Sequence, residues 1–142
     1  MSSYLTFYLV PKEGDQKPLK LWTYSRNSDV YQAFHTHANI AYIGIEEPIN
    51  YTEITKPLIE KVIDGLEEQI EDAEDELKYI IDYTAKLANI NSEVYDDYLC
   101  SCSEQEQQIR DLKYALSEVE FINNTLSDLE YSSFSKMLAN ID

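Results

Sequence analysis

Apolar and polar residues follow a strand-like pattern in two segments near the N-terminus. YLTFYLV, residues 4–10, is rich in aromatic and β-branched side chains, and LKLWTYS, residues 19–25, alternates apolar with polar positions. Both patterns are typical of β-strands, and the polar connection PKEGDQKP between them predicts a β-hairpin over residues 4–25. Two strands alone are marginally stable, so the hairpin is expected to pack on another element.

A short helix is predicted directly after the hairpin. In RNSDVYQAFHTH, Asn27 or Ser28 can act as the N-cap ahead of apolar residues at helical spacing, and the helix should end near His37. The segment that follows, residues 38–51, is mixed in character and is interpreted as a connector, with a short strand at residues 40–45 as an alternative.

A helical period begins near residue 52. Thr52 or Thr55 can start the helix, and Pro57 is acceptable in a first helical turn. Apolar residues then recur at intervals of three and four: Ile59, Ile63, Leu66, Ile70, Ala73, Leu77, Ile80, Thr84 and Leu87. This unbroken seam predicts a long helix with coiled-coil character.

A second seam follows a short break, where Asn91 and Ser92 can cap a new helix. Its positions are Tyr98, Cys102, Gln105, Ile109, Leu112, Leu116, Val119, Asn123 and Leu126. A tight break between two long amphipathic helices predicts an antiparallel helical hairpin, about 50 Å long at about 1.5 Å of rise per residue. The tail, residues 131–142, is expected to add a further turn of helix.

The predicted fold class is therefore α+β, mostly α. Residues 1–50 form a head of β-hairpin and short helix, and residues 51–142 form an acidic, coiled-coil-like antiparallel helical hairpin, all in one folded unit. Several apolar residues of the two long helices lie outside the seams and need a third covering surface. They are Leu58, Val62, Ile81, Leu99, Phe121, Ile122 and Leu129. The head, the C-terminal tail or a second copy of the chain could cover them.

The charge of the chain is strongly asymmetric. The formal net charge is −16, and residues 51–142 hold twenty-two of the acids but only seven of the bases. This balance excludes a general nucleic-acid or anionic-membrane binder, since both need Lys and Arg to neutralise phosphates or head groups. A charged partner should be a basic protein.

Two further features bear on the compartment. The sequence has no apolar run of about 20 residues and no signal-peptide pattern at its N-terminus, so a cytoplasmic protein with no membrane contact is expected. Cys100 and Cys102 point in divergent directions on a helix and are interpreted as free thiols, consistent with a reducing compartment.

The densest acidic stretch is DGLEEQIEDAEDE, residues 64–76, which has eight carboxylates and no base. The heptad register places Leu66, Ile70 and Ala73 on the seam and the acids on the remaining positions. We interpret these acids as a candidate interaction surface: Asp64, Glu67, Glu68, Glu71, Asp72, Glu74, Asp75 and Glu76. The same register predicts that Glu67 pairs with Lys113 and that Glu74 faces Glu106.

Motifs for chemistry are absent from the sequence. The acidic stretch lacks the Gly and the alternating acids of a calcium loop, and the long helices lack the Glu-x-x-His pairs of di-iron bundles. His35 and His37 diverge on a helix, although on a strand they could bind a metal. No G-x-S-x-G elbow or Gly-rich phosphate loop occurs. We therefore predict no catalytic residue, no metal and no cofactor, and a protein that is not an enzyme.

The chain contains twelve tyrosines, and tyrosine suits both small mixed cores and binding surfaces. Half-buried packing around the helical hairpin and a protein interface remain alternatives for the five on the long helices: Tyr79, Tyr83, Tyr95, Tyr98 and Tyr114.

The N-terminal runs SYLTFYLVPKE and PLKLWTYSRNSDVYQAF resemble the opening of short proteins encoded in bacteriophage and prophage genomes. Those proteins place a strand pair ahead of a long, charged helical segment. The resemblance covers about the first 35 residues and implies a phage or prophage setting, without an activity or a functional residue.

The sequence thus predicts a non-enzymatic protein–protein interaction or assembly protein, a phage or prophage accessory or structural factor that forms a homo-oligomer in the bacterial cytoplasm or associates with the virion. The alternative is an acidic inhibitor, of the anti-defence or nucleic-acid-mimic type, that docks on a basic groove of a host protein.

Overall fold

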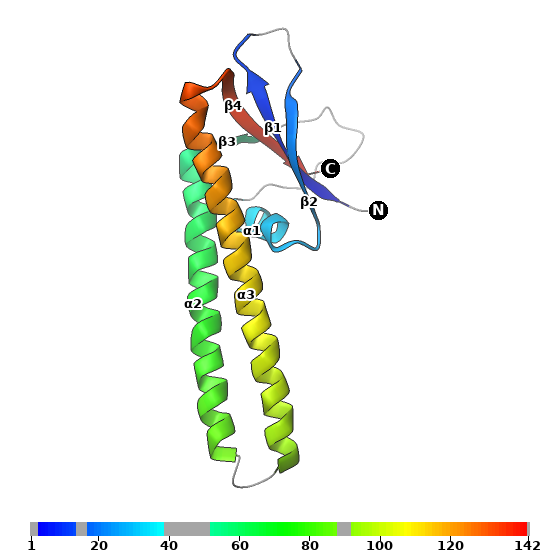
Figure 1. Cartoon of the computed structure of the whole chain (residues 1–142), viewed down its shortest axis with the longest axis vertical. Helices are drawn as coiled ribbons and strands as arrows, with labels where there is room; N and C mark the ends of the chain where they lie inside the picture. Colours follow the sequence, from blue (N-terminus) through cyan, green and yellow to red (C-terminus); the bar gives the residue numbers. More distant parts are fainter. Residues whose placement is uncertain (1–2, 14–16, 39–51, 88–91, 142) are drawn as a thin grey trace.

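A computed structural model describes residues 3–13, 17–38, 52–87 and 92–141 of the chain. A small antiparallel sheet lies against one end of a long pair of helices, and the other end of the pair extends well beyond it (Figure 1). The predicted class, mostly α with an N-terminal β-hairpin, a short helix and a long helix pair, is confirmed.

Within the described residues, the sheet has four strands rather than the two of a hairpin. Strands β1 (Tyr4–Pro11) and β2 (Leu19–Ser25) pair antiparallel as predicted. Strand β4 (Phe134–Ile141) pairs with the other side of β1, and the short strand β3 (Thr52–Ile54) pairs with β4. The strand order is β2-β1-β4-β3, so both chain ends contribute to the centre of the sheet.

The C-terminal strand corrects the expected further turn of helix over residues 131–142. After a 3-10 turn, η1 (Leu129–Tyr131), the Ser132 hydroxyl donates to the Leu129 carbonyl at 2.8 Å and accepts from the Phe134 amide at 3.1 Å, which turns the chain. The apolar side chains buried beyond this turn alternate: Met137, Ala139 and Ile141. This period of two suits a strand, and β1 supplies the backbone partners that such a strand needs.

Strand β3 begins at Thr52, which is one of the two residues where the long helix was predicted to start. Of the two proposed helix starts, only Thr55 serves as one: its hydroxyl accepts from the Leu58 amide at 3.4 Å, whereas Thr52 lies in β3. The alternative strand at residues 40–45 lies outside the described residues.

The described part of the chain also forms three α-helices. Helix α1 (Asp29–His37) is capped by Ser28, whose hydroxyl accepts from the Tyr31 amide at 3.2 Å. Helices α2 (Lys56–Leu87) and α3 (Ser92–Asp128) run antiparallel, as the two seams predict.

The seam side chains of the middle and sheet-proximal parts of α2 and α3 form their contact. In α2, Leu66, Ile70 and Ala73 are buried, and in α3 the buried seam residues include Ile109 and Leu112. A polar contact crosses the same seam, where Gln105 Nε2 donates to the Ala73 carbonyl at 3.0 Å.

Phe7 lies at the centre of the core between the sheet and the helices. It is fully buried, and its ring makes edge contacts with Trp22, Tyr24 and Phe34 at centroid distances of 6.1, 6.0 and 5.2 Å. Helix α1 lies between the sheet and the helix pair (Figure 1). The aromatic cluster therefore ties β1, β2 and α1 together.

This core covers some of the apolar side chains of α2 and α3 that lie outside the two seams. Val62, Ile122 and Leu129 belong to it and are buried. Ile81, Leu99 and Phe121 remain 48%, 44% and 56% exposed.

Candidate interaction surfaces

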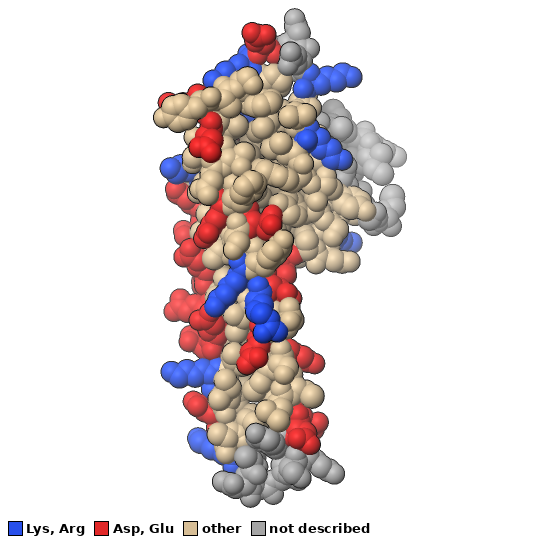
Figure 2. Space-filling view, in the orientation of Figure 1, with Lys and Arg blue, Asp and Glu red and all other residues tan. Residues whose placement is uncertain are grey.

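The acidic stretch of α2 is a solvent-facing surface. Asp64, Glu67, Glu68, Glu71, Asp72, Glu74, Asp75 and Glu76 are all exposed. Leu66, Ile70 and Ala73 within it are at most 8% exposed, which fits the predicted register. Figure 2 shows acidic side chains gathered along the helix pair, below the mostly uncharged sheet end. We refer to the eight acids as the acidic surface.

The predicted ion pair between Glu67 and Lys113 is wrong. Lys113 Nζ instead lies 3.1 Å from Glu74 Oε1, and both side chains are about half exposed. Both residues occupy e positions, as expected, but Lys113 pairs with the glutamate one heptad farther along α2 than Glu67. An exposed pair of this kind contributes at most about 1 kcal/mol, so the acidic surface stays almost uncompensated.

Large apolar side chains are exposed on the part of the helix pair farthest from the sheet. The exposed fractions are 69% for Tyr79, 48% for Ile81, 40% for Tyr83 and 44% for Leu99. Ile81 stands about 200° round α2 from Tyr79, so these residues lie on more than one side of the helix pair; we call the four together the distal arm patch. Tyr83 stacks on Tyr79 at a centroid distance of 6.2 Å and makes an edge contact with the half-buried Tyr98 at 5.2 Å.

The tyrosines of the long helices differ in whether they pack within the protein or are exposed to a partner. Tyr79 and Tyr114 are each 69% exposed and are free to contact a partner, whereas Tyr98 is half-buried. The side chain of Tyr95 lies outside the described part of the structure.

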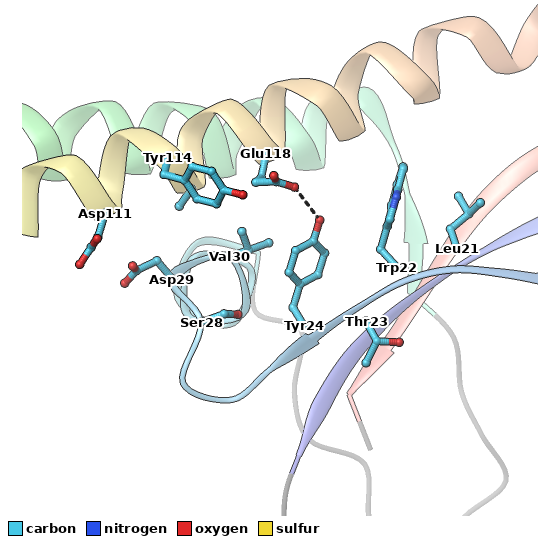
Figure 3. Close-up of a pocket in the computed structure, with 11 residues that line it drawn as sticks. Leu21, Trp22, Thr23, Tyr24, Ser28, Asp29, Val30, Asp111, Tyr114 and Glu118 are labelled. Atoms are coloured by element: carbon cyan, nitrogen blue, oxygen red, sulfur yellow. Dashed lines mark hydrogen bonds between the residues drawn. The ribbon is translucent and has the colours of Figure 1, made fainter.

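A cleft of about 620 Å³ opens between β2, α1 and α3. Residues 21–24 of β2 form one wall, residues 28–30 form the floor at the start of α1, and α3 supplies Asp111, Tyr114, Ala115 and Glu118. In Figure 3, Tyr24 and Glu118 point toward one another across it, while Asp29 and Asp111 lie together at one end. The cleft brings together residues nearly one hundred positions apart.

The electrostatics of the cleft favour a positive charge. The Tyr24 hydroxyl donates to Glu118 Oε2 at 3.1 Å. Desolvation, followed by the Glu118 carboxylate, raises the pKa of Tyr24 well above its usual range, so the phenol stays a neutral donor. Desolvation and then the Asp111 carboxylate raise the pKa of Asp29. Desolvation is the larger cause of both pKa shifts, and the repulsion by the neighbouring carboxylates adds to it.

A second hollow, of about 450 Å³, lies where β3, α2, α3 and β4 meet. Its charged residues are of both signs, Glu53 and Glu130 with Lys56 and Lys136. This hollow therefore differs from the first cleft, in which all the charged lining residues are acidic.

The histidines and cysteines are the remaining residues that could bind a metal or react, and both histidines contact neighbouring side chains. His37 Nε2 lies 2.9 Å from Gln69 Oε1 on α2, and the His35 ring stacks on Tyr31 at a centroid distance of 6.3 Å. Cys100 is an exposed free thiol and Cys102 a half-buried one. Within the described ranges, no group of three or more His, Cys, Asp or Glu side chains is arranged to hold a metal ion, and no helix is long and apolar enough to cross a bilayer.

The chain belongs to the DUF3839 family. The family model, described as a protein of unknown function, matches residues 1–139. No curated protein and no solved structure matches the chain. The match covers β1, β2, β3, the three helices and β4 except for its last two residues. The surfaces described above therefore all lie within the matched region.

Sequence reasoning found the acidic surface but missed the cleft. The acidic surface is contiguous in sequence, whereas the cleft combines three elements. Of its residues, the sequence had singled out Ser28 as one of two possible N-caps of a short helix, and the structure confirms that role.

Proposed function

We propose that this protein is a non-enzymatic interaction and assembly protein that associates with a second copy of itself through the distal arm patch. The observation that carries the proposal is the exposure of Tyr79, Ile81, Tyr83 and Leu99 on a part of the helix pair remote from the sheet. Large exposed apolar side chains gathered at one end of a charged helix pair are typical of interaction sites.

The register of the helices supports a helical interface. Ile81 and Leu99 both fall at e positions, which adjoin across an antiparallel pair. A second copy that lays its own arm alongside would bury them in a four-helix arrangement of the kind common in bundles.

Charge also favours the distal end as the contact. Residues 77–99 carry the acids Asp82, Glu93, Asp96 and Asp97 against the bases Lys78 and Lys86, while residues 64–76 carry eight acids and no base. Two copies therefore repel one another less at the arm ends than along the acidic surface.

Light scattering with mass determination tests this assembly. We expect a dimer or larger species for the wild type and a monomer for the double variant Ile81→Glu and Leu99→Glu, because burying two carboxylates in the interface is costly. Circular dichroism should show the helices intact, since both positions are exposed.

The matched control adds the same two charges elsewhere on α3, through Gln108→Glu and Asn124→Glu, which are exposed. This control should assemble like the wild type. A wild-type chain that remains monomeric at about 0.1 mM, well above the Kd of a specific dimer, would contradict self-assembly.

The setting that we infer is a phage or prophage, in the cytoplasm of the bacterial host or in association with the virion. The support is the resemblance of residues 3–13 and 18–34 to proteins of such genomes.

The acidic surface favours a second candidate, an inhibitor that docks on the basic groove of a host protein. Its eight carboxylates are exposed, and within the described residues only Glu74 has an ion-pair partner. A rigid helix that carries uncompensated carboxylates can imitate the phosphates of a nucleic acid, and electrostatic steering accelerates its binding.

Reversing four of these charges tests the second candidate. The variant Glu67→Lys, Glu68→Lys, Glu71→Lys and Asp75→Lys should keep its helicity, because all four side chains are exposed. From host lysate at low salt, the wild type should retain a nucleic-acid enzyme that high salt or the reversal releases. Equal retention by wild type and variant would exclude the acidic surface as the docking site.

A further inference from the structure

Strand β2 forms an open edge of the sheet. In the order β2-β1-β4-β3 it pairs with β1, and among the described strands no other lies on its outer side. The Ser25 carbonyl already accepts from the Ser28 amide at 2.9 Å and the Ser28 hydroxyl at 2.8 Å, and the other outward-facing amides and carbonyls of β2 can accept an added strand.

An irregularity divides this edge into two parts. The β1–β2 register shifts between Thr6 and Tyr8, so that Leu21 and Trp22 together stand opposite Phe7. Such a bulge interrupts regular pairing on the bulged strand. Residues 19–20 pair regularly with β1 on one side of the bulge and residues 23–25 on the other, and only the second part lies at the end of β2 nearest α1.

The cleft lies beside this same end of the edge. It is lined by β2, α1 and α3, while β1 contributes no side chain to it. A strand added outside β2 would direct alternate side chains toward the helices, and those side chains would enter the cleft.

The lining of the cleft specifies a cationic side chain. Its charged residues are Asp29, Asp111 and Glu118, with no Lys or Arg among the lining residues. Glu118 accepts the Tyr24 bond on Oε2, which leaves Oε1 for a ligand. Tyr114, 69% exposed, offers an aromatic face. A planar guanidinium can pair with a carboxylate and stack on an aromatic ring at once.

We propose that a basic, extended segment of a partner protein adds to the edge of β2 and places an arginine side chain in the cleft, against Asp111, Glu118 and Tyr114. This inference rests on the proposed protein–protein interaction function but uses a surface separate from the distal arm patch. Charge complementarity supports the occupant, since both the cleft and the whole chain, at −16, are negative.

Trp22 provides the reporter, because it lines the cleft and is the single tryptophan of the chain. The probe is the peptide Thr-Val-Arg-Val-Thr with blocked ends, so that the guanidinium is its only charge. We expect a saturable change in tryptophan fluorescence with a Kd below about 1 mM. The same peptide with citrulline in place of arginine should bind at least about ten-fold more weakly, since it keeps the shape but lacks the charge.

Matched variants locate the site. Asp111→Asn with Glu118→Gln should weaken the arginine peptide at least about ten-fold. Glu67→Gln with Glu71→Gln removes the same charge from the acidic surface and should leave the Kd within about two-fold. A peptide methylated on alternate backbone nitrogens should lose binding if strand addition is the mode.

Three results would overturn the inference: no saturable change with the arginine peptide, equal binding of the citrulline peptide, or equal loss in the two pairs of variants. Mass determination on the same samples separates the two proposals. A monomeric wild type with a Trp22 response rejects assembly through the arm and keeps the cleft, whereas an assembled wild type without that response rejects the cleft alone.

Discussion

At the residue scale, Gly65 controls how closely α1 approaches α2. A Cβ atom at this position would overlap the imidazole ring of His37, which lies directly against the helix. His37 then reaches Gln69, one helical turn farther along α2, for its hydrogen bond. A glycine that costs helix stability by about 1 kcal/mol relative to alanine is thus compensated by the packing of a second helix.

The substitution Gly65→Ala should therefore change the free energy of unfolding differently in two backgrounds. In the wild type we expect no net gain in the free energy of unfolding, because the ring is displaced and its hydrogen bond, worth about 1 kcal/mol, is lost. In the His37→Ala background, where the ring is gone, the same change should stabilise by about 1 kcal/mol. Urea unfolding of the four proteins measures this coupling, and an equal gain in both backgrounds would contradict the close approach.

At the element scale, β4 holds the two ends of the chain together. It pairs with β1 over most of its length and supplies the partner for β3. Met137, Ala139 and Ile141 bury their side chains in the core, while Ser135 and Lys136 face solvent. The sheet consequently closes only when the last strand has docked, and a two-stranded hairpin would be marginal without it.

Shortening a buried side chain of β4 should destabilise the whole protein. Met137 is fully buried, so Met137→Ala should lower the free energy of unfolding by about 2–5 kcal/mol. Its exposed neighbour provides the control, and Lys136→Ala should change stability by no more than about 0.5 kcal/mol. Chemical denaturation followed by circular dichroism gives both values. A loss of less than about 1 kcal/mol for Met137→Ala would show that β4 is not part of the cooperative core.

At the scale of the whole molecule, charge and apolar exposure separate along the helix pair. The acidic surface occupies residues 64–76, while the distal arm patch lies beyond it on residues 79–83 and 99. The sheet end carries little net charge, since residues 1–50 contain five acids and four bases. Self-repulsion is therefore concentrated on the long helices, and it opposes folding of those helices most strongly.

Salt should consequently stabilise this protein. Raising NaCl from about 0.1 M to about 1 M shortens the Debye length from about 10 Å to about 3 Å, which screens the acids from one another. We expect the midpoint of thermal unfolding to rise by about 4 °C or more. The four-lysine variant of the acidic surface, which halves the net charge of −16, should respond less. A midpoint that falls with salt would mean that attractive ion pairs dominate instead.

Sequence patterns correctly predicted the features that depend on neighbouring residues, such as helix caps and helical periodicity. The caps Ser28 and Thr55 and the buried seam positions Leu66, Ile70 and Ala73 all occur where the sequence places them. Strand β4 was mistaken for helix, because Phe134, Met137, Leu138 and Ile141 fit a helical spacing as well as a strand. The choice depended on β1, more than a hundred residues away, and no local window contains that information.

The sequence by itself determined that this is an α+β chain of mostly long helices, with the acids of residues 64–76 turned away from the seam, because helical periodicity is a property of neighbouring residues. Only the tertiary structure decided that the C-terminus is a strand, that Lys113 pairs with Glu74, and that β2, α1 and α3 enclose an acidic, aromatic cleft. The physical reason is the same in each case. Backbone pairing, side-chain reach and cavity shape depend on residues that only folding brings together.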